Sequence, residues 1–146
     1  MAGTRHNMTA TPIQKAAAIV AIAFLAVGVL GFIPRVTTDF DRIEFAGHES
    51  GAELLGLFQV SVLHNIVHLG FGAIGLFAIR TAIAARNYLI GGGIVYLVLW
   101  VYGLIIDTSG DANFVPLNDA DDWLHLGLGA AMILSGVVLS RRRVST

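Results

Sequence analysis

The sequence has no cysteine and few charged residues, and these two shortages restrict what the protein can be. The absence of cysteine from 146 residues excludes disulfides, thiolate metal ligands and a cysteine nucleophile. Charged residues make up 13% of the chain, about half of the roughly 25% with which a soluble domain covers its surface. Hydrophobic residues make up 55%, which favours lipid as the solvent. No basic stripe with interleaved aromatic residues is present, so nucleic acid is not an expected partner.

Complete catalytic motifs are also missing. The chain contains no Gly-x-Ser-x-Gly elbow, P-loop or dinucleotide fingerprint. Gly91–Gly93 fall at the start of an apolar stretch, where they favour close helix packing over phosphate binding. His64 and His68 are spaced as in a zinc-protease motif, but Asn65 stands where that motif has its general base. The sequence therefore favours a protein without enzymatic activity.

Apolar residues gather in four long stretches. About 20 helical residues cross a 30 Å hydrocarbon core, and each stretch is near or above that length. The stretches are Ala16–Ile33, Leu54–Ile79, Tyr88–Ile106 and Trp123–Ser140. We predict an all-α fold, a four-transmembrane-helix bundle forming one membrane domain over residues 1–146. Its predicted helices cover about 13–33, 56–79, 88–107 and 122–140.

The first stretch has one alternative interpretation, a cleaved signal peptide. Arg5 and Lys15 precede it, as basic residues precede such peptides. Its apolar run exceeds the usual 7–15 residues, and no A-x-A-like site follows around 31–34. We therefore expect it to remain as a membrane span.

Basic and acidic residues are unevenly distributed among the segments that flank and join the stretches. Short segments rich in Lys and Arg stay in the cytoplasm. The two tails and the second connection contain basic residues and no acid: Arg5, Lys15, Arg80, Arg86, Arg141, Arg142 and Arg143. The first connection contains four acids, Asp39, Asp41, Glu44 and Glu49, against Arg35 and Arg42. The third contains Asp111, Asp119, Asp121 and Asp122 and no Lys or Arg. This division predicts a multi-pass protein of the bacterial plasma membrane with both termini in the cytoplasm.

Polar residues inside the stretches mark a candidate site, because each costs free energy in lipid unless it has a partner. His64, Asn65 and His68 share one side of the second predicted helix. The direction of each helix places these residues, and Asp107 and His125 from the next two helices, in the outward half of the membrane. The predicted polar pocket or metal site consists of His64, His68, His125, Asp107 and Asp121, supported by Asn65, Tyr96, Asn113, Asn118 and Asp122.

Several uses of this pocket remain open at the level of sequence. Histidines four residues apart can hold one divalent metal ion, with His125 and a carboxylate completing the shell. A haem needs axial ligands from two helices, such as His68 and His125, and contact with a quinone is a related possibility. The simplest use is hydrogen bonding between helices, and passage of protons or solutes is a further one.

An ordered set of residues runs through about half of the chain: Phe58–Leu69, Arg80-Thr81, Tyr88–Gly93, Tyr96, Trp100, Tyr102-Gly103, Asp107, Asn113–Asn118 and Asp122–His125. With this set, the stretch from Gly56 to Gly129 resembles a family of small actinobacterial membrane proteins, domain of unknown function 4383. The resemblance implies a four-helix membrane fold and an actinobacterial source, and it implies no activity.

Two functional hypotheses follow. The first is a non-enzymatic accessory or scaffolding protein that packs in the bilayer with itself or with a larger membrane complex. The second is a metal- or haem-binding protein that uses His64, His68 and His125. A transporter is a weaker third hypothesis, because four short spans leave little room for a pathway.

Overall fold

The computed structural model describes residues 10–141, with the backbone but not the side chain of Arg141. The elements are α1 (Pro12–Leu30), β1 (Thr37–Thr38), η1 (Phe40–Arg42), β2 (Ala52–Leu54), β3 (Phe58–Val60), α2 (Val62–Ala78), α3 (Ala82–Ile105) and α4 (Asp119–Arg141). Four helices are therefore present, as predicted. Arg5, Arg142, Arg143 and the side chain of Arg141, which the predicted orientation uses, lie outside the described part.

At the start of each helix, a polar side chain accepts a hydrogen bond from a backbone N–H group at or just before the first turn. Ser61 accepts from the N–H of His64, and Thr81 accepts from that of Ala84, both at 3.1 Å. The side chain of Asn118 accepts from the N–H of Asp121 at 3.0 Å. At α1, Gln14 accepts from the backbone N–H of Thr11 at 2.9 Å and donates to Ile79 at 2.7 Å, which joins the start of α1 to the end of α2.

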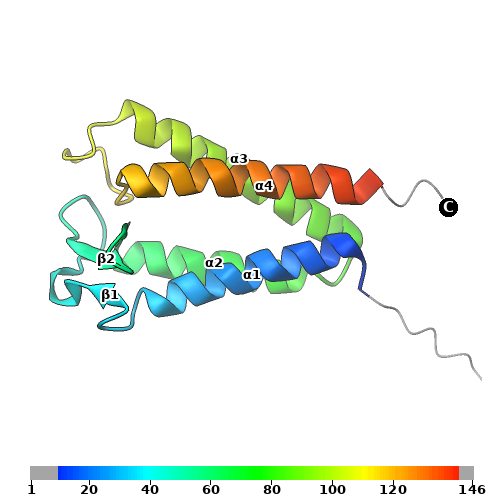
Figure 1. Cartoon of the computed structure of the whole chain (residues 1–146), viewed down its shortest axis with the longest axis horizontal. Helices are drawn as coiled ribbons and strands as arrows, with labels where there is room; N and C mark the ends of the chain where they lie inside the picture. The colour runs from blue at the N-terminus through cyan, green and yellow to red at the C-terminus, as the bar shows by residue number, and fades with distance from the viewer. Residues whose placement is uncertain (1–9, 142–146) are drawn as a thin grey trace, which may run out of the picture.

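The helices form two pairs, α1 with α2 and α3 with α4 (Figure 1). Contact between α2 and α3 is much less extensive. Glycines permit the close approach within each pair. A Cβ atom added at Gly72 would lie 2.5 Å from Leu25 of α1, and one added at Gly93 would lie 2.6 Å from Ile133 of α4.

A three-stranded antiparallel sheet, ordered β1-β2-β3, covers one end of the helices (Figure 1). Thr37 pairs with Leu54, and Ala52 pairs with Val60. The buried side chains of Ala52, Leu54 and Val60 pack against Val27 and Leu30 of α1. The sheet adds a β element to the predicted all-α fold.

The predicted helix 56–79 is too long at its start. Residues Phe58–Val60 form β3, and α2 begins only at Val62, after the Ser61 cap. A short apolar run is compatible with both a buried strand and a helix, and for this reason the helix was predicted to begin too early. By contrast, α3 begins at Ala82, six residues before the predicted 88, because Thr81 caps it directly after a short turn.

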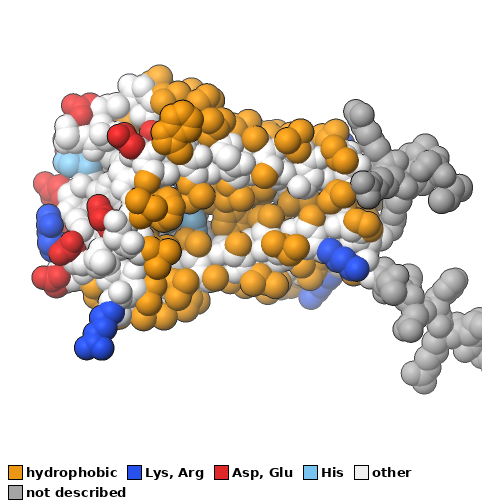
Figure 2. Space-filling model, in the orientation of Figure 1, with side chains coloured by type: hydrophobic (Ala, Val, Ile, Leu, Met, Phe, Trp, Pro, Cys, Tyr) orange, Lys and Arg blue, Asp and Glu red, His pale blue; other side chains and the backbone are white. Residues whose placement is uncertain are grey.

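On the face that Figure 2 shows, apolar side chains are spread along the length of the helices, whereas charged side chains gather toward the two ends. Within residues 10–141, α1, α3 and α4 are long and apolar enough to cross a membrane, and α2 is a shorter apolar helix. At about 1.5 Å per residue, the 17 residues of α2 span roughly 26 Å. The chain is therefore a small protein with helices suited to a membrane.

Candidate functional site

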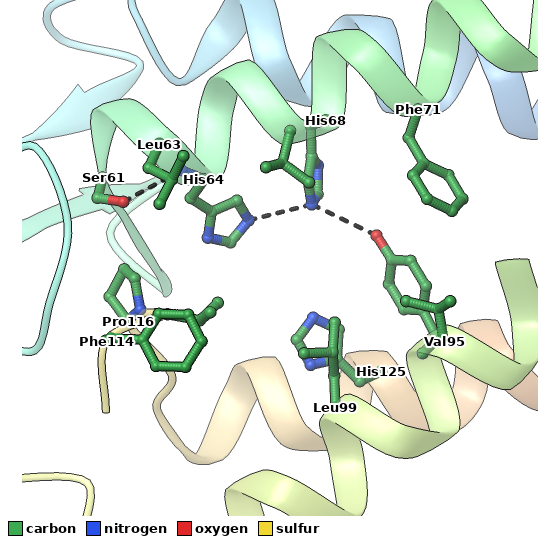
Figure 3. Close-up of a pocket in the computed structure, with 13 residues that line it drawn as sticks. Ser61, Leu63, His64, His68, Phe71, Val95, Leu99, Phe114, Pro116 and His125 are labelled. Carbon is green, nitrogen blue, oxygen red and sulfur yellow. Dashed lines mark hydrogen bonds between the residues drawn. The ribbon is translucent and has the colours of Figure 1, made fainter. Parts of the chain in front are cut away.

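A pocket of about 260 Å³ lies between α2 and α3 at the end of the helices that carries the sheet. Side chains from α2 line one side, and side chains from α3 and His125 of α4 line the other (Figure 3). The connection between α3 and α4 covers the pocket with Phe114, Val115 and Pro116. Most of its wall is apolar, and its polar groups are concentrated on a few side chains.

Histidines 64 and 68 supply the polar groups of α2. They are one helical turn apart and therefore lie on one side of the helix. Their Nε2 atoms are 3.1 Å apart, within hydrogen-bonding distance (Figure 3). His64 is only 8% exposed. The two imidazoles thus form a hydrogen-bonded pair on one wall of the pocket.

Tyr96 brings α3 to the same pair. Its hydroxyl oxygen is 3.3 Å from Nε2 of His68. Phe24 of α1 stacks on the Tyr96 ring, with centroids 5.4 Å apart, and meets the His68 ring edge-on at 5.5 Å. These aromatic contacts fix both rings, so the polar wall has a defined shape.

His125 completes the cluster from α4. Its ring meets Tyr96 edge-on at a centroid distance of 5.0 Å, and the side chain is 3% exposed. Its Nδ1 is buried without a hydrogen-bond partner among the described residues. Three of the four helices therefore contribute polar side chains to one buried cluster.

The histidine pair has unused hydrogen-bonding capacity. A neutral imidazole carries one N–H, so one ring of a neutral pair donates through Nε2 and the other accepts. One Nδ1 is then a bare acceptor, and the other carries a hydrogen. The Nδ1 atoms of both His64 and His68 are buried without partners in the described chain. Each such group costs about 1–3 kcal/mol of stability, so the pair is suited to a ligand that pairs with it.

The predicted carboxylates do not join the histidines. Asp107 is exposed beyond the end of α3, and the pKa of its carboxyl is lowered chiefly by a 2.6 Å hydrogen bond from the Ser109 hydroxyl. Asp121 accepts from the backbone N–H groups of Gln59 and Asn118, at 3.1 and 3.2 Å. Asp122 is buried beside Gly103, and its Oδ1 has no partner among the described residues.

The geometry gives the metal hypothesis no support. Within residues 10–141, no group of three or more His, Asp or Glu side chains is arranged to hold a metal ion. The acids that would complete the shell around the histidines serve other elements: Asp121 links β3 to the start of α4.

Two of the predicted supporting residues, Asn113 and Asn118, hold the α3–α4 connection and the start of α4 through hydrogen bonds. The side chain of Asn113 donates to the carbonyls of Thr108 and Leu117 and accepts from the N–H of Leu117, which holds the α3–α4 connection in shape. Asn118 caps α4 and donates to Leu57 at 2.9 Å. Asn65 is fully buried against Gly31 of α1 and does not line the pocket, and neither polar atom of its side chain has a partner among the described residues.

The sequence reasoning did not identify the apolar walls. Val67 and Phe71 of α2, Val95 of α3 and Phe114 of the connection line the pocket, but they look like ordinary lipid-facing or loop residues in the sequence. Val67 and Phe71 are three and seven residues after His64, a spacing that places all three side chains on one side of α2. This spacing was the signal in the sequence that could have identified them.

Comparison with known proteins identifies a family and nothing more specific. The model of the family described as Domain of unknown function (DUF4383) matches residues 14–138, which includes every residue of the pocket. No curated protein and no solved structure matches the chain.

Proposed function

The chain belongs to the DUF4383 family, and from this premise we propose that it is a non-enzymatic accessory protein of the bacterial plasma membrane. It crosses the bilayer four times as a helix bundle and packs with a second copy of itself or with a larger membrane complex. The lack of a complete catalytic motif and the apolar outer surface support this proposal.

The distribution of charge supports an orientation with the sheet outside and both termini in the cytoplasm. All ten acids of the sequence lie between residues 39 and 53 or between 107 and 122, in or beside the two connections at the sheet end. The sheet end also contains Arg35 and Arg42, whereas Lys15, Arg80 and Arg86 lie near the opposite ends of α1, α2 and α3, where no acid is present in the sequence. Basic segments stay on the cytoplasmic side, so the end with these residues faces inward.

Three outward-facing glycines carry the proposal that the protein packs with another membrane helix. Gly70 of α2, Gly91 of α3 and Gly127 of α4 are exposed, and a Cβ atom added at any of them would meet nothing within 4 Å. Packing inside the chain therefore does not explain them. In lipid, small residues let the backbones of separate helices approach closely, which is where helix association gains contact energy.

Leucine at these positions tests association. We expect native mass spectrometry of the protein in mild detergent to give an oligomer or a defined complex. Gly70→Leu, Gly91→Leu or Gly127→Leu should shift that species toward the monomer, because the added side chain separates the helices. Ile94→Leu, at a 51% exposed position of α3, is the matched control and should leave the mass unchanged. A monomeric native protein, or an oligomer unaffected by all three leucines, would contradict the proposal.

A further inference from the structure

The pocket between α2 and α3 opens sideways, toward the surface that faces lipid. Val67 of α2 and Val95 of α3 both line it, and their side chains are 52% and 44% exposed. A residue that lines a pocket and also lies on the outer surface marks its mouth. Because α2 and α3 contact each other little, the mouth runs between these two helices, and it extends to the 58% exposed Phe114 of the α3–α4 connection. In the membrane placement proposed above, it opens into the hydrocarbon layer.

Within the described residues 10–141, no charged side chain lines this pocket. Its polar groups are Ser61, three histidines and Tyr96, with no Asp, Glu, Lys or Arg among the lining residues. A buried charge without an opposite charge is strongly disfavoured, so a carboxylate or phosphate headgroup does not suit the site. The ligand that enters from lipid and stays here is therefore neutral.

The polar wall requires more than a hydrocarbon chain. Nδ1 of His64, of His68 and of His125 are all buried without partners among the described residues. An acyl chain in the pocket would leave these nitrogens unpaired. A carbonyl oxygen accepts from an imidazole N–H, and a hydroxyl donates to a bare ring nitrogen.

The apolar walls suit a flat ring. Phe71 lies at one end of the pocket and Phe114 at its cover, with the polar side chains between them (Figure 3). The volume of about 260 Å³ is below the usual range of roughly 300–1,000 Å³ for sites that enclose a drug-sized ligand. The site therefore encloses a ring with its polar substituents, and a longer tail remains in the lipid between Val67 and Val95.

From these features we infer that the pocket binds a neutral, membrane-soluble ring compound of the quinone class. The ring lies between the aromatic walls, a carbonyl oxygen accepts a hydrogen bond from the histidine pair, and the apolar tail leaves through the mouth between α2 and α3. The inference concerns binding alone and depends on the proposed membrane placement, not on association with a partner.

Titration with decylubiquinone, which has a quinone ring and a ten-carbon tail, tests this inference. The full chain in detergent micelles is labelled with ¹⁵N at histidine, and the ring nitrogen shifts are followed. We expect a saturable shift of the pocket histidines. Decylbenzene, which has the tail and a ring without carbonyls, should give no saturable shift. The absence of saturation with decylubiquinone, or an equal response to decylbenzene, would overturn the inference.

A tryptophan at the mouth locates the site. Val67→Trp should block entry and weaken binding by about tenfold or more, a change that corresponds to roughly 1.4 kcal/mol. Ile74→Trp is the matched control, because Ile74 is on the same helix, is 59% exposed and does not line the pocket. Unchanged affinity in Val67→Trp, or equal loss in both variants, would overturn the inferred site. Val95→Trp, on the opposite side of the mouth, replaces Val67→Trp if that variant does not fold.

Removing the polar wall separates ring recognition from simple insertion. The double variant His64→Leu with His68→Leu should also bind decylubiquinone about tenfold more weakly, read from the shift of the remaining His125. Retained affinity would show that the apolar walls alone hold the ligand and would refute the hydrogen-bonded quinone. A monomeric protein that still gives the saturable shift would contradict only the proposed association.

Discussion

The two halves of the helix assembly are held together by different means. In the half next to the sheet, side-chain hydrogen bonds hold the chain in place. Asp121 links α4 to the distant strand β3, and Asn113 forms local hydrogen bonds that shape the connection above the pocket. In the opposite half, the apolar side chains of Ala17, Ala85 and Leu89 are fully buried. The first half carries polar groups with unused capacity, whereas the second half packs apolar atoms closely.

This difference separates a half suited to binding from a half suited to structural support. Unpaired buried nitrogens are unfavourable for stability, and they occur at His64, His68 and His125 near the sheet end. In the other half, α1 is held to α2 and α3 to α4 mainly by apolar packing, and its few polar groups include the hydrogen bond from Gln14 to Ile79 and the buried hydroxyl of Tyr88. We therefore expect substitutions in the two halves to disturb the protein by different mechanisms.

The largest effect is expected at the polar link between the sheet and α4. Asp121→Ala removes the acceptor of two backbone N–H groups, those of Gln59 and Asn118, and should lower the free energy of unfolding by about 3 kcal/mol. Unfolding by SDS titration measures the change. Asp119→Ala, an exposed acid two residues earlier, is the control and should cost less than about 0.5 kcal/mol. Equal effects of the two substitutions would remove Asp121 from its proposed structural role.

A smaller but opposed pair of effects is expected within α2. At Gly75, an added Cβ would lie 2.5 Å from that of Ala21 and 2.7 Å from the Tyr88 hydroxyl. Gly75→Ala should therefore cost about 2 kcal/mol in the same titration, because neither neighbour can move away freely. Gly70→Ala, on the same helix where an added Cβ meets nothing within the chain, should be neutral for the monomer or stabilise it by up to about 1 kcal/mol through helix propensity. The comparison fails if Gly75→Ala is as stable as Gly70→Ala.

Much of the helical framework could be predicted from the sequence, because long apolar runs and capping residues are local signals. The placement of His64 and His68 on one side of α2 follows from their spacing alone. Their meeting with Tyr96 and His125 required only the order and direction of the helices. These parts of the site were accessible because helical periodicity fixes which side chains face the same way.

The sheet and the separation of the acids from the pocket could not be predicted in this way. The strands are two or three residues long, and the turn between β2 and β3 places Leu55 at φ 58° beside Gly56 at φ 65°. Leucine is rare at positive φ and gives no turn signal. The contact of Asp121 with Gln59 joins residues 62 positions apart, and it depends on that sheet being formed. Sequence position alone places Asp121 near the level of the histidines, and only the sheet shows that its carboxylate binds β3 instead.

The measurement that tests the central claim most directly is cysteine accessibility in intact cells. The native chain has no cysteine, so single substitutions report without background. Asp111→Cys, in the α3–α4 connection, should react with a membrane-impermeant maleimide in intact cells. Ile83→Cys, 75% exposed in the first turn of α3, should react only after the cells are permeabilised. Val95→Cys, at the lipid-facing mouth, should react in neither condition. Labelling of Ile83→Cys but not of Asp111→Cys in intact cells would contradict the account, since the sheet and the pocket would then lie on the cytoplasmic side.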